Sequence, residues 1–323
     1  ECSEKYNTPV LFRPTTRVCH AYASIDNCDS PSPKKYEGFV KDSKKWVIFP
    51  RLSFANHIMI EKRNVEIGKD FSTYSANKAE GVNSEKAVVT SGISYAYTKE
   101  CLKDYPNVKL IKIATAYPFP EDFVLSSLEG AKEVLCIEEL SPFIEEQILK
   151  LAGKHGLQLR VSGKLDGKVQ AGGENSTDKI AAILGEFLGK DFTAEGYDLS
   201  DAPALPVRPP VLCAGCPHRA SFYAVKQAMK GRKAYFCGDI GCYTLGNAMP
   251  LDMVDTCLCM GAGITMAQGF NHTDSDGVCF GFVGDSTFFA SGITGVVNAV
   301  HNNADMILCV LDNSTTAMTG HQS

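Results

Sequence analysis

The C-terminal stretch of the chain, residues 278–323, contains a pattern that permits few folds. Residues 278–283 form a short apolar run, as expected for a strand buried on both faces of a parallel sheet. Apolar residues then recur at helical spacing from Ile293 to Val300, and residues 306–311 form a second apolar run. The order strand, helix, strand predicts a right-handed βαβ unit, in which both strands end at the same edge of the sheet.

Polar residues follow both predicted strands at that edge. Gly284 and Asp285 follow the first strand, and Asn313 follows the second. The carboxylate of Asp285, the side-chain amide of Asn313 and the backbone carbonyl of Thr315 supply the oxygen ligands that Mg²⁺ prefers when it binds together with a diphosphate. Gly284 would let the turn approach the diphosphate, and N–H groups at the start of the following helix would face the anion. An ordinary βαβ unit explains the short Gly-Asp signal equally well.

The longer segments of this stretch resemble a known family. They are GDSTFF, SGITGVVNAV and LDNSTTAMTGHQ, and they resemble the thiamin-diphosphate motif of indolepyruvate ferredoxin oxidoreductase, large (alpha) subunit. The general motif is Gly-Asp-Gly followed at a distance by Asn, and this chain has Ser286 in place of the second glycine. Ala290 stands where the resemblance implies a histidine, so no histidine role is carried over. The resemblance implies bound thiamin diphosphate and Mg²⁺, with the metal held by Asp285, Asn313 and Thr315.

The composition limits what the chain can bind. It is 44% hydrophobic and 21% charged with a formal net charge of −5, which is typical of a soluble globular protein and argues against a nucleic-acid partner. No apolar run reaches the length of a membrane helix, and the N-terminus lacks the features of a signal peptide. The 13 cysteines are an odd number, several within apolar runs, which favours buried thiols in a reducing compartment. We therefore expect a cytoplasmic protein that contacts no membrane.

The length of 323 residues predicts two or more domains. Because the chain begins without Met and ends within a loop directly after a motif, we expect it to be a fragment of a longer polypeptide.

Residues 1–30 are expected to be the end of a domain whose body lies outside this chain. Residues 9–16 (PVLFRPTT) predict a strand with proline at its start. The segment TPVLFRPTTRVCHA is similar to the end of the family's pyrimidine-binding domain. A structural role is the preferred interpretation of its polar side chains, although they could face substrate. These side chains are Arg13, Thr15, Thr16 and His20.

Residues 29–45 are polar and lysine-rich and predict a solvated linker.

A regular alternation of strand and helix patterns begins at Ala87. The apolar runs AVVTSG, LIKIAT, EVLCIEE and LQLRVSG alternate with helical stretches, which predicts a parallel α/β domain. Ser141 and Pro142 are suited to the N-cap and the first position of one helix. Glu138 and Glu139 could form an acid–base pair, although a charge pair at the start of a helix is the preferred interpretation. This region resembles the family's middle domain, related to the transketolase C-terminal domain, which carries structure and interface rather than the cofactor.

A proline-rich connector, residues 191–212, leads to a cysteine motif. Cys213 and Cys216 have soft-metal spacing, but two cysteines cannot close a tetrahedral site. The resemblance supplies Cys242, because in related 2-oxoacid:ferredoxin oxidoreductases the matching cysteines join a distant fourth to hold a [4Fe-4S] cluster. Against this, a Pro-His pair replaces the usual glycine, and the indolepyruvate branch usually carries its clusters on a C-terminal ferredoxin-like segment. Inert or cofactor-lining thiols remain the alternative.

Residues 255–270 (DTCLCMGAGITMAQGF) predict a strand, a glycine turn and a helix between these motifs. Gly261 and Gly263 would permit close approach of the backbone to a ligand. Met260 could support the bent thiamin, although methionine at a helix start more often belongs to a core. The residues expected at the cofactor are Gly261, Gly284, Asp285, Ser286, Asn313 and Thr315.

The whole chain is thus predicted to be an α/β protein with parallel-sheet domains, in which a transketolase C-terminal-like domain precedes the thiamin-diphosphate-binding fold. Residues 1–30 would be the tail of the pyrimidine-binding domain. Residues 31–200 would be a linker with the transketolase-like domain, and residues 201–323 the pyrophosphate-binding domain.

The resemblance implies oxidative decarboxylation of an aryl 2-oxoacid such as indolepyruvate. Electrons would pass through iron–sulfur clusters to ferredoxin, coenzyme A would take the acyl group, and a beta subunit would be the protein partner. The glutamate that activates the aminopyrimidine is expected outside this chain, so the chain alone should be inactive. The alternatives are another 2-oxoacid:ferredoxin oxidoreductase, a thiamin-dependent decarboxylase, or a non-catalytic Mg-diphosphate binding module.

Overall fold

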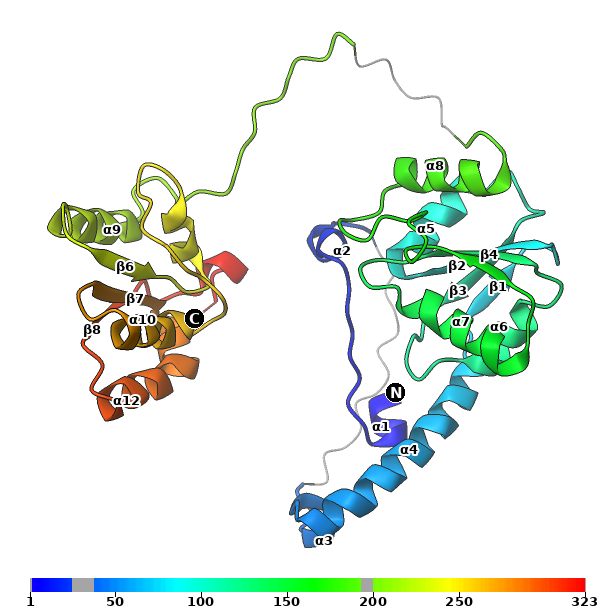
Figure 1. Cartoon of the computed structure of the whole chain (residues 1–323), viewed down its shortest axis with the longest axis horizontal. Coiled ribbons are helices and arrows are strands. Elements are labelled where there is room, and N and C mark those ends of the chain that lie inside the picture. The colour runs from blue at the N-terminus through cyan, green and yellow to red at the C-terminus, as the bar shows by residue number, and fades with distance from the viewer. Residues whose placement is uncertain (1, 25–37, 193–199, 323) are drawn as a thin grey trace. The chain divides into compact units, whose positions relative to one another are not determined.

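A computed structural model describes residues 2–24, 38–192 and 200–322, and the chain forms two compact units (Figure 1). Unit 1 spans residues 1–198 and unit 2 spans residues 199–323. Within the described ranges, no helix combines the length and the apolar character that a membrane span requires.

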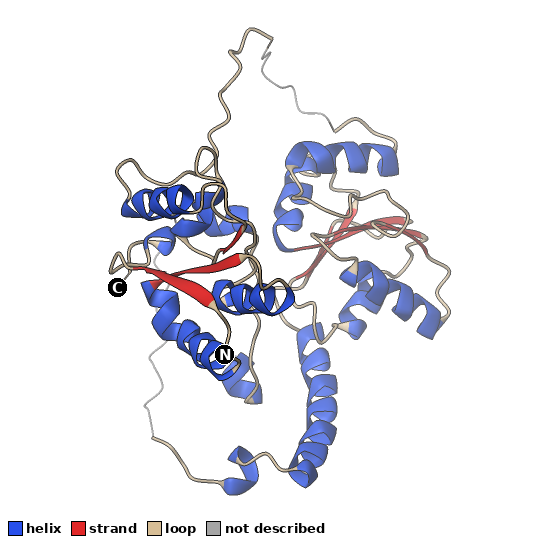
Figure 2. Cartoon of the chain, turned by 60° about the vertical axis from the view of Figure 1, so that its left-hand side comes forward, coloured by secondary structure: helices blue, strands red, loops and turns tan. Residues whose placement is uncertain are grey.

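Unit 1 is built on a five-stranded sheet with the order β1-β3-β2-β4-β5 (Figure 2, red). Strand β1 is antiparallel to β3, and the other pairs are parallel. The alternation that begins at Ala87 predicts the four parallel strands, whereas it gives no sign of β1. The strands are β1 (Lys78–Glu80), β2 (Lys86–Ser91), β3 (Lys109–Ile113), β4 (Glu133–Ile137) and β5 (Arg160–Ser162).

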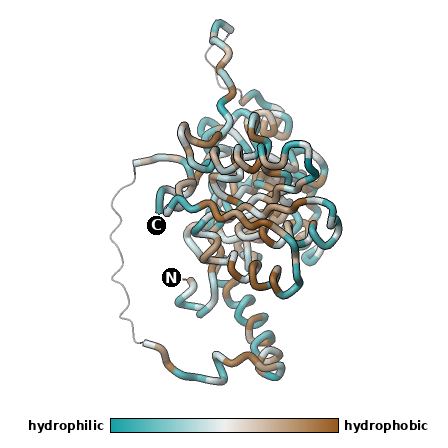
Figure 3. Tube along the Cα trace, turned by 90° about the vertical axis from the view of Figure 1, so that its left-hand side faces the viewer, coloured by the Kyte–Doolittle hydropathy of each residue, from teal (hydrophilic) through white to brown (hydrophobic). Residues whose placement is uncertain are grey.

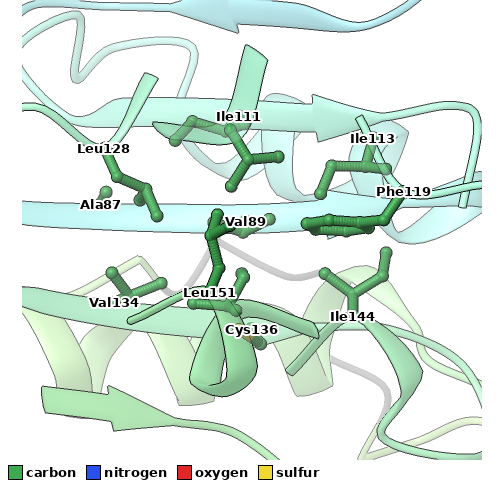
Figure 4. Close-up of a cluster of buried hydrophobic side chains, with 12 residues drawn as sticks. Ala87, Val89, Ile111, Ile113, Phe119, Leu128, Val134, Cys136, Ile144 and Leu151 are labelled. Carbon is green, nitrogen blue, oxygen red and sulfur yellow. The ribbon is translucent and has the colours of Figure 1, made fainter. Parts of the chain in front are cut away.

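Helices pack on both faces of this sheet. Side chains alternate between the two faces along each strand, so neighbouring residues of a strand contact different helices. Val89 packs in a cluster with side chains of α6 and α7 (Figure 4), whereas its neighbour Val88 packs with side chains of α8. Both valines are fully buried. Each such side chain contributes roughly 1.5–3 kcal/mol on burial. The helices are α5 (Gly92–Cys101), α6 (Glu121–Ser127), α7 (Phe143–His155) and α8 (Thr177–Leu188).

The predicted strand at residues 9–16 is wrong. Residues 9–15 have no regular structure, and a single helical turn begins at Thr16. Two prolines and the absence of a pairing strand among the described residues explain the difference, since a strand needs a neighbour for its backbone hydrogen bonds. Arg13, Thr16 and His20 are exposed and Thr15 is half-buried. The helices of this part are α1 (Cys2–Tyr6), α2 (Thr16–His20), α3 (Ser43–Trp46) and α4 (Pro50–Ser72).

The predicted linker at residues 29–45 lies partly outside the described residues. Its last residues enter α3, whose N-cap is Asp42, and the carboxylate of Asp42 accepts the N–H of Lys44 at 2.9 Å. The 23-residue helix α4 was not anticipated. Apolar and polar residues are interspersed along this helix (Figure 3), and several of its large apolar side chains are exposed, so the sequence lacks the clear apolar stripe that predicts a helix.

The start of α7 also differs from the prediction. The helix begins at Phe143, and neither Ser141 nor Pro142 caps it with a side chain. Instead, the buried carboxylate of Glu138 accepts the N–H groups of Ile144 at 2.9 Å and Glu145 at 3.0 Å. Burial raises the pKa of Glu138, and these two hydrogen bonds act against that rise. The carboxylate of Glu139 accepts the N–H of Asn175 at 3.0 Å, so both carboxylates have structural partners.

Unit 2 contains the predicted βαβ unit within a three-stranded parallel sheet of order β6-β7-β8. The helix between β7 and β8 includes a π-helical segment at Phe288–Gly292. The strand expected near Thr256 is reduced to one isolated bridge with Cys237. The strands are β6 (Ala234–Cys237), β7 (Val278–Gly284) and β8 (Met306–Leu311), and the helices are α9 (Pro217–Ala228), α10 (Ala262–Thr273), α11 (Asp285–Thr287) and α12 (Ile293–His301).

The two faces of this sheet are packed by different helices. Phe282 lies on the face that α9 covers, with its ring centroid 4.8 Å from that of Phe222. On the other face, Ala267 of α10 packs against Cys237 and Cys279. A Cβ on Gly263 would lie 2.8 Å from the carbonyl oxygen of Phe282, so the glycine is required for α10 to contact the strand ends. The close approach predicted for Gly263 is therefore to the sheet.

Replacing Glu138 with alanine should destabilise unit 1, because the first N–H groups of α7 would lose their buried acceptor. The expected loss is about 1–3 kcal/mol in the free energy of unfolding, measured by chemical denaturation. Glu146→Ala is the matched control, since Glu146 is an exposed glutamate in the first turn of the same helix, and it should cost less than about 1 kcal/mol. Equal losses in both variants would contradict the capping role.

Candidate functional site

A pocket lies in unit 2 at the edge where β7 and β8 end. Five of the six residues predicted to contact the cofactor line it: Gly284, Asp285, Ser286, Asn313 and Thr315. The parallel pairing of Gly284 with Leu311 places the residues after both strands at this edge. Gly261 does not line the pocket, but its neighbour Met260 does.

The oxygen atoms predicted to hold Mg²⁺ are present in this pocket. Oδ1 of Asp285 accepts the N–H of Ser286 at 2.9 Å, and Oδ1 of Asn313 accepts the N–H of Thr315 at 3.2 Å. Each oxygen keeps a lone pair for a further partner. Carboxylate, amide and carbonyl oxygens are hard ligands, so the donor set fits Mg²⁺. The N–H of Ser286, in the helix that follows β7, is already bonded to Asp285, so fewer N–H groups are available to a diphosphate.

Asp312 adds a second carboxyl group that the sequence pattern did not single out. Ser314 donates its N–H to Oδ1 of Asp312 at 2.9 Å. That hydrogen bond lowers the pKa of Asp312, and a hydrogen bond with Asp285 lowers the pKa further. Asp312 therefore lies next to Asp285, although it does not line the pocket itself.

His218 is a second unanticipated residue of the pocket. Its side chain is only 3% exposed, and Nε2 lies 3.5 Å from Nδ2 of Asn313. The imidazole also meets the ring of Tyr243 edge to face, with centroids 6.0 Å apart. Burial lowers the pKa of His218, and the charge of Asp285 acts in the opposite direction. One feature of the sequence could have drawn attention to His218: it follows the Cys-x-x-Cys motif closely and lies in the first turn of α9.

Tyr243 explains the glycine at the start of the motif. A Cβ on Gly284 would lie 2.5 Å from Cε1 of Tyr243, and a Cβ on Gly241 would lie 2.5 Å from Cζ of the same ring. The hydroxyl of Tyr243 donates to the carbonyl of Ile240 at 3.1 Å. The ring thus lies against two glycines. The position of Gly284 requires glycine because of this packing, whereas the sequence predicted that glycine was needed for the turn to approach a diphosphate.

The loop that carries Met260 is fixed by a buried carboxylate. Oδ1 of Asp239, a fully buried residue, accepts the N–H of Gly261 at 2.5 Å at the N-terminus of α10. Burial raises the pKa of Asp239, and the backbone N–H groups around it act against that rise. Gly261 has a left-handed φ of 91°, which favours glycine. Met260 is 49% exposed, so it is a pocket side chain rather than a core residue.

The three predicted cluster cysteines lie near one another. Cys242 lines the pocket, Cys216 is the N-cap of α9, and Cys213 is exposed. Burial raises the pKa of the Cys242 thiol, and its proximity to Cys216 and Cys213 raises that pKa further. Among the described residues, no three His, Cys, Asp or Glu side chains are arranged to hold a metal ion. A cluster at these cysteines stays a prediction. Ala290, in the π-helical segment, is exposed and does not line the pocket.

Comparison with known proteins agrees with the chemistry of this pocket. Residues 239–323 match the family model of the thiamine pyrophosphate enzyme, C-terminal TPP binding domain. The indolepyruvate oxidoreductase subunit IorA of Methanothermobacter thermautotrophicus is 38% identical over 331 residues, covering 100% of this chain and 53% of that subunit. The IorA subunit of Archaeoglobus fulgidus is 34% identical over 334 residues, covering 100% of this chain and 52% of that subunit. The chain therefore spans about half the length of these relatives.

The solved structures give only weak likeness. The 2-oxoglutarate:ferredoxin oxidoreductase from Magnetococcus marinus aligns with a TM-score of 0.31 and 15% identity, covering 43% of this chain and 23% of that chain. The benzoylformate decarboxylase from Polynucleobacter necessarius aligns with a TM-score of 0.26 and 13% identity, over 79% of this chain and 52% of that chain. The family match and the sheets of the chain itself establish the predicted fold class.

Replacing Gly284 with alanine should destabilise unit 2, because the new Cβ would overlap the ring of Tyr243. The expected loss is about 1–3 kcal/mol in the free energy of unfolding. The matched control is Gly269→Ala, since a Cβ at that exposed position in α10 meets no atom within 4 Å. That control should gain up to about 1 kcal/mol from helix propensity. Thermal and chemical denaturation of both variants measure the difference, and an unchanged stability of Gly284→Ala would contradict the packing role.

Proposed function

We propose that this chain, a relative of the indolepyruvate oxidoreductase IorA subunits along its whole length, is the thiamin-diphosphate-binding part of a 2-oxoacid oxidoreductase. The observation that carries the proposal is the presence of Asp285, Asn313 and Thr315 in one pocket, within the range that matches the thiamine pyrophosphate enzyme domain. The chain spans about half the length of these relatives, so the activity is proposed for an enzyme that contains this chain and not for the chain by itself.

The pocket residues divide into two roles. Asp285, Asn313 and the carbonyl of Thr315 would hold Mg²⁺ with the diphosphate, and Met260, which also lines the pocket, would present an apolar side chain to the cofactor. When bound, thiamin diphosphate supplies a nucleophilic carbon and an electron sink for decarboxylation. The contribution of this chain is to orient the cofactor and to compensate its charge.

The finer assignment follows the IorA relatives. The substrate would be an aryl 2-oxoacid such as indolepyruvate, with ferredoxin as the electron acceptor and coenzyme A as the acyl acceptor. A second, beta subunit would complete the enzyme. The support for this assignment is that six IorA subunits match the chain from end to end at 32–38% identity.

Asp285→Ala should abolish Mg²⁺-dependent binding of thiamin diphosphate, because it removes the carboxylate from the metal site. Isothermal titration calorimetry of thiamin diphosphate in the presence of Mg²⁺ measures the effect, and we expect a loss of affinity of about a hundredfold or more. Asp305→Ala is the matched control, since Asp305 is an exposed aspartate just before the other end of β8, and its affinity should equal that of the unmodified protein. An unchanged affinity of Asp285→Ala would show that the site lies elsewhere.

Iron content tests the cluster. If Cys213, Cys216 and Cys242 hold a [4Fe-4S] cluster, anaerobically purified protein should be brown and should lose that iron on Cys216→Ser. Cys259→Ser is the control, because Cys259 is an exposed thiol outside the motif. Iron content and visible absorption that do not change on Cys216→Ser would leave these cysteines as pocket and surface thiols.

A further inference from the structure

The side-chain amide of Asn313 is held at both ends. Its Oδ1 accepts the N–H of Thr315 at 3.2 Å, while its Nδ2 lies 3.5 Å from Nε2 of His218. An amide nitrogen only donates, so Nε2 of His218 must be the acceptor, and the imidazole proton is then on Nδ1. The N–H of Thr315 distinguishes the two orientations of the amide, because a flipped amide would place its NH₂ group against that donor.

The imidazole is itself fixed by its surroundings. His218 is 3% exposed, it lies in the first turn of α9 directly after Pro217, and its ring packs edge to face on Tyr243. Tyr243 in turn lies against Gly241 and Gly284, and its hydroxyl is bonded to the carbonyl of Ile240. A buried ring with these neighbours has little freedom to turn away from the amide.

We propose that His218 is a positioning residue, which accepts a hydrogen bond from Nδ2 of Asn313 and so directs Oδ1 of Asn313 toward the bound Mg²⁺. This inference rests on the proposed function, because it assigns Asn313 to the metal. The hydrogen bond matters most before the metal binds, because it adds to the hydrogen bond from Thr315 in favouring the orientation that presents oxygen to the cation. The sequence Cys-Pro-His would thus serve the metal site through its histidine.

Mg²⁺ titration in the presence of saturating thiamin diphosphate tests this role. His218→Phe keeps an aromatic ring against Tyr243 but removes the acceptor, and it should weaken Mg²⁺ binding about three- to tenfold, the range expected for one hydrogen bond. His218→Gln offers an amide oxygen as acceptor, and it should restore the affinity to within about twofold. His218→Met has a similar size to Gln without that acceptor, and it should behave like Phe. A loss that is the same in Gln, Met and Phe would overturn the proposal.

A double-mutant cycle separates this contact from general packing. Asn313→Ala removes the side-chain amide without offering His218 a new partner, so His218→Phe should have no further effect on the remaining Mg²⁺ affinity in that background. An undiminished effect of His218→Phe in the Asn313→Ala background would show that His218 acts through something other than the amide, and would overturn the proposal.

An NMR measurement on the cofactor-free protein distinguishes a failure of this inference from a failure of the proposed function. In a ¹H–¹⁵N spectrum, the side-chain amide signals of Asn313 are identified by their loss in Asn313→Asp. They should shift on His218→Phe and return close to their original position on His218→Gln. If they shift while the unmodified protein binds no Mg²⁺ and thiamin diphosphate, the hydrogen bond exists but the proposed function and the positioning role both fail. If thiamin diphosphate binds but these signals do not move, the positioning role alone is wrong.

Discussion

The parallel pairing of β7 with β8 is the constraint on which the site depends. Gly284 pairs with Leu311, so the chain leaves both strands at one edge, and Asp285 and Asn313 line the same pocket although 28 positions separate them. A register shift of one residue would turn the side chains of one strand to the opposite face. The buried phenylalanines of β7 oppose such a shift, since Phe280 and Phe282 both pack in the cluster that includes Phe222 of α9. The hydrophobic core thus sets the position of the polar residues.

Small residues let the other elements approach this edge. Gly263 allows α10 to contact the carbonyls of the strand ends, and Cβ atoms on Gly292 and Gly295 would each lie 3.2 Å from Ile264 of α10. The helix that follows Asp285 therefore packs closely on α10, and α10 is itself capped by the buried carboxylate of Asp239. Oδ1 of this carboxylate accepts a backbone N–H that the helix N-terminus leaves without a partner, which offsets part of the cost of burying it.

The sequence predicted the parts of the fold that follow from local periodicity. Buried apolar runs marked β7 and β8, and their order required the shared edge that brings Asp285 to Asn313. It did not predict contacts made by distant residues: the cap of α7 comes from Glu138 rather than from adjacent Ser141, and Gly284 is required by the ring of Tyr243. His218 was likewise hidden, because nothing in its local pattern indicates which strand end it will meet. The strand predicted at residues 9–16 failed for a related reason, since strand propensity has no effect without a partner strand.

The polar groups of the site are held in place by hydrogen bonds within the protein. Asp285 is bonded to the N–H of Ser286, and the amide of Asn313 lies between the N–H of Thr315 and the ring of His218. Groups fixed in this way lose little conformational entropy when a ligand arrives, so more of the interaction energy remains as affinity. The same contacts leave lone pairs of oxygen facing the pocket. If Asp285 and Asn313 hold a cation, as proposed, the cation would meet side chains that are already ordered, and its binding would not depend on refolding of the segment from Asn313 to Thr315.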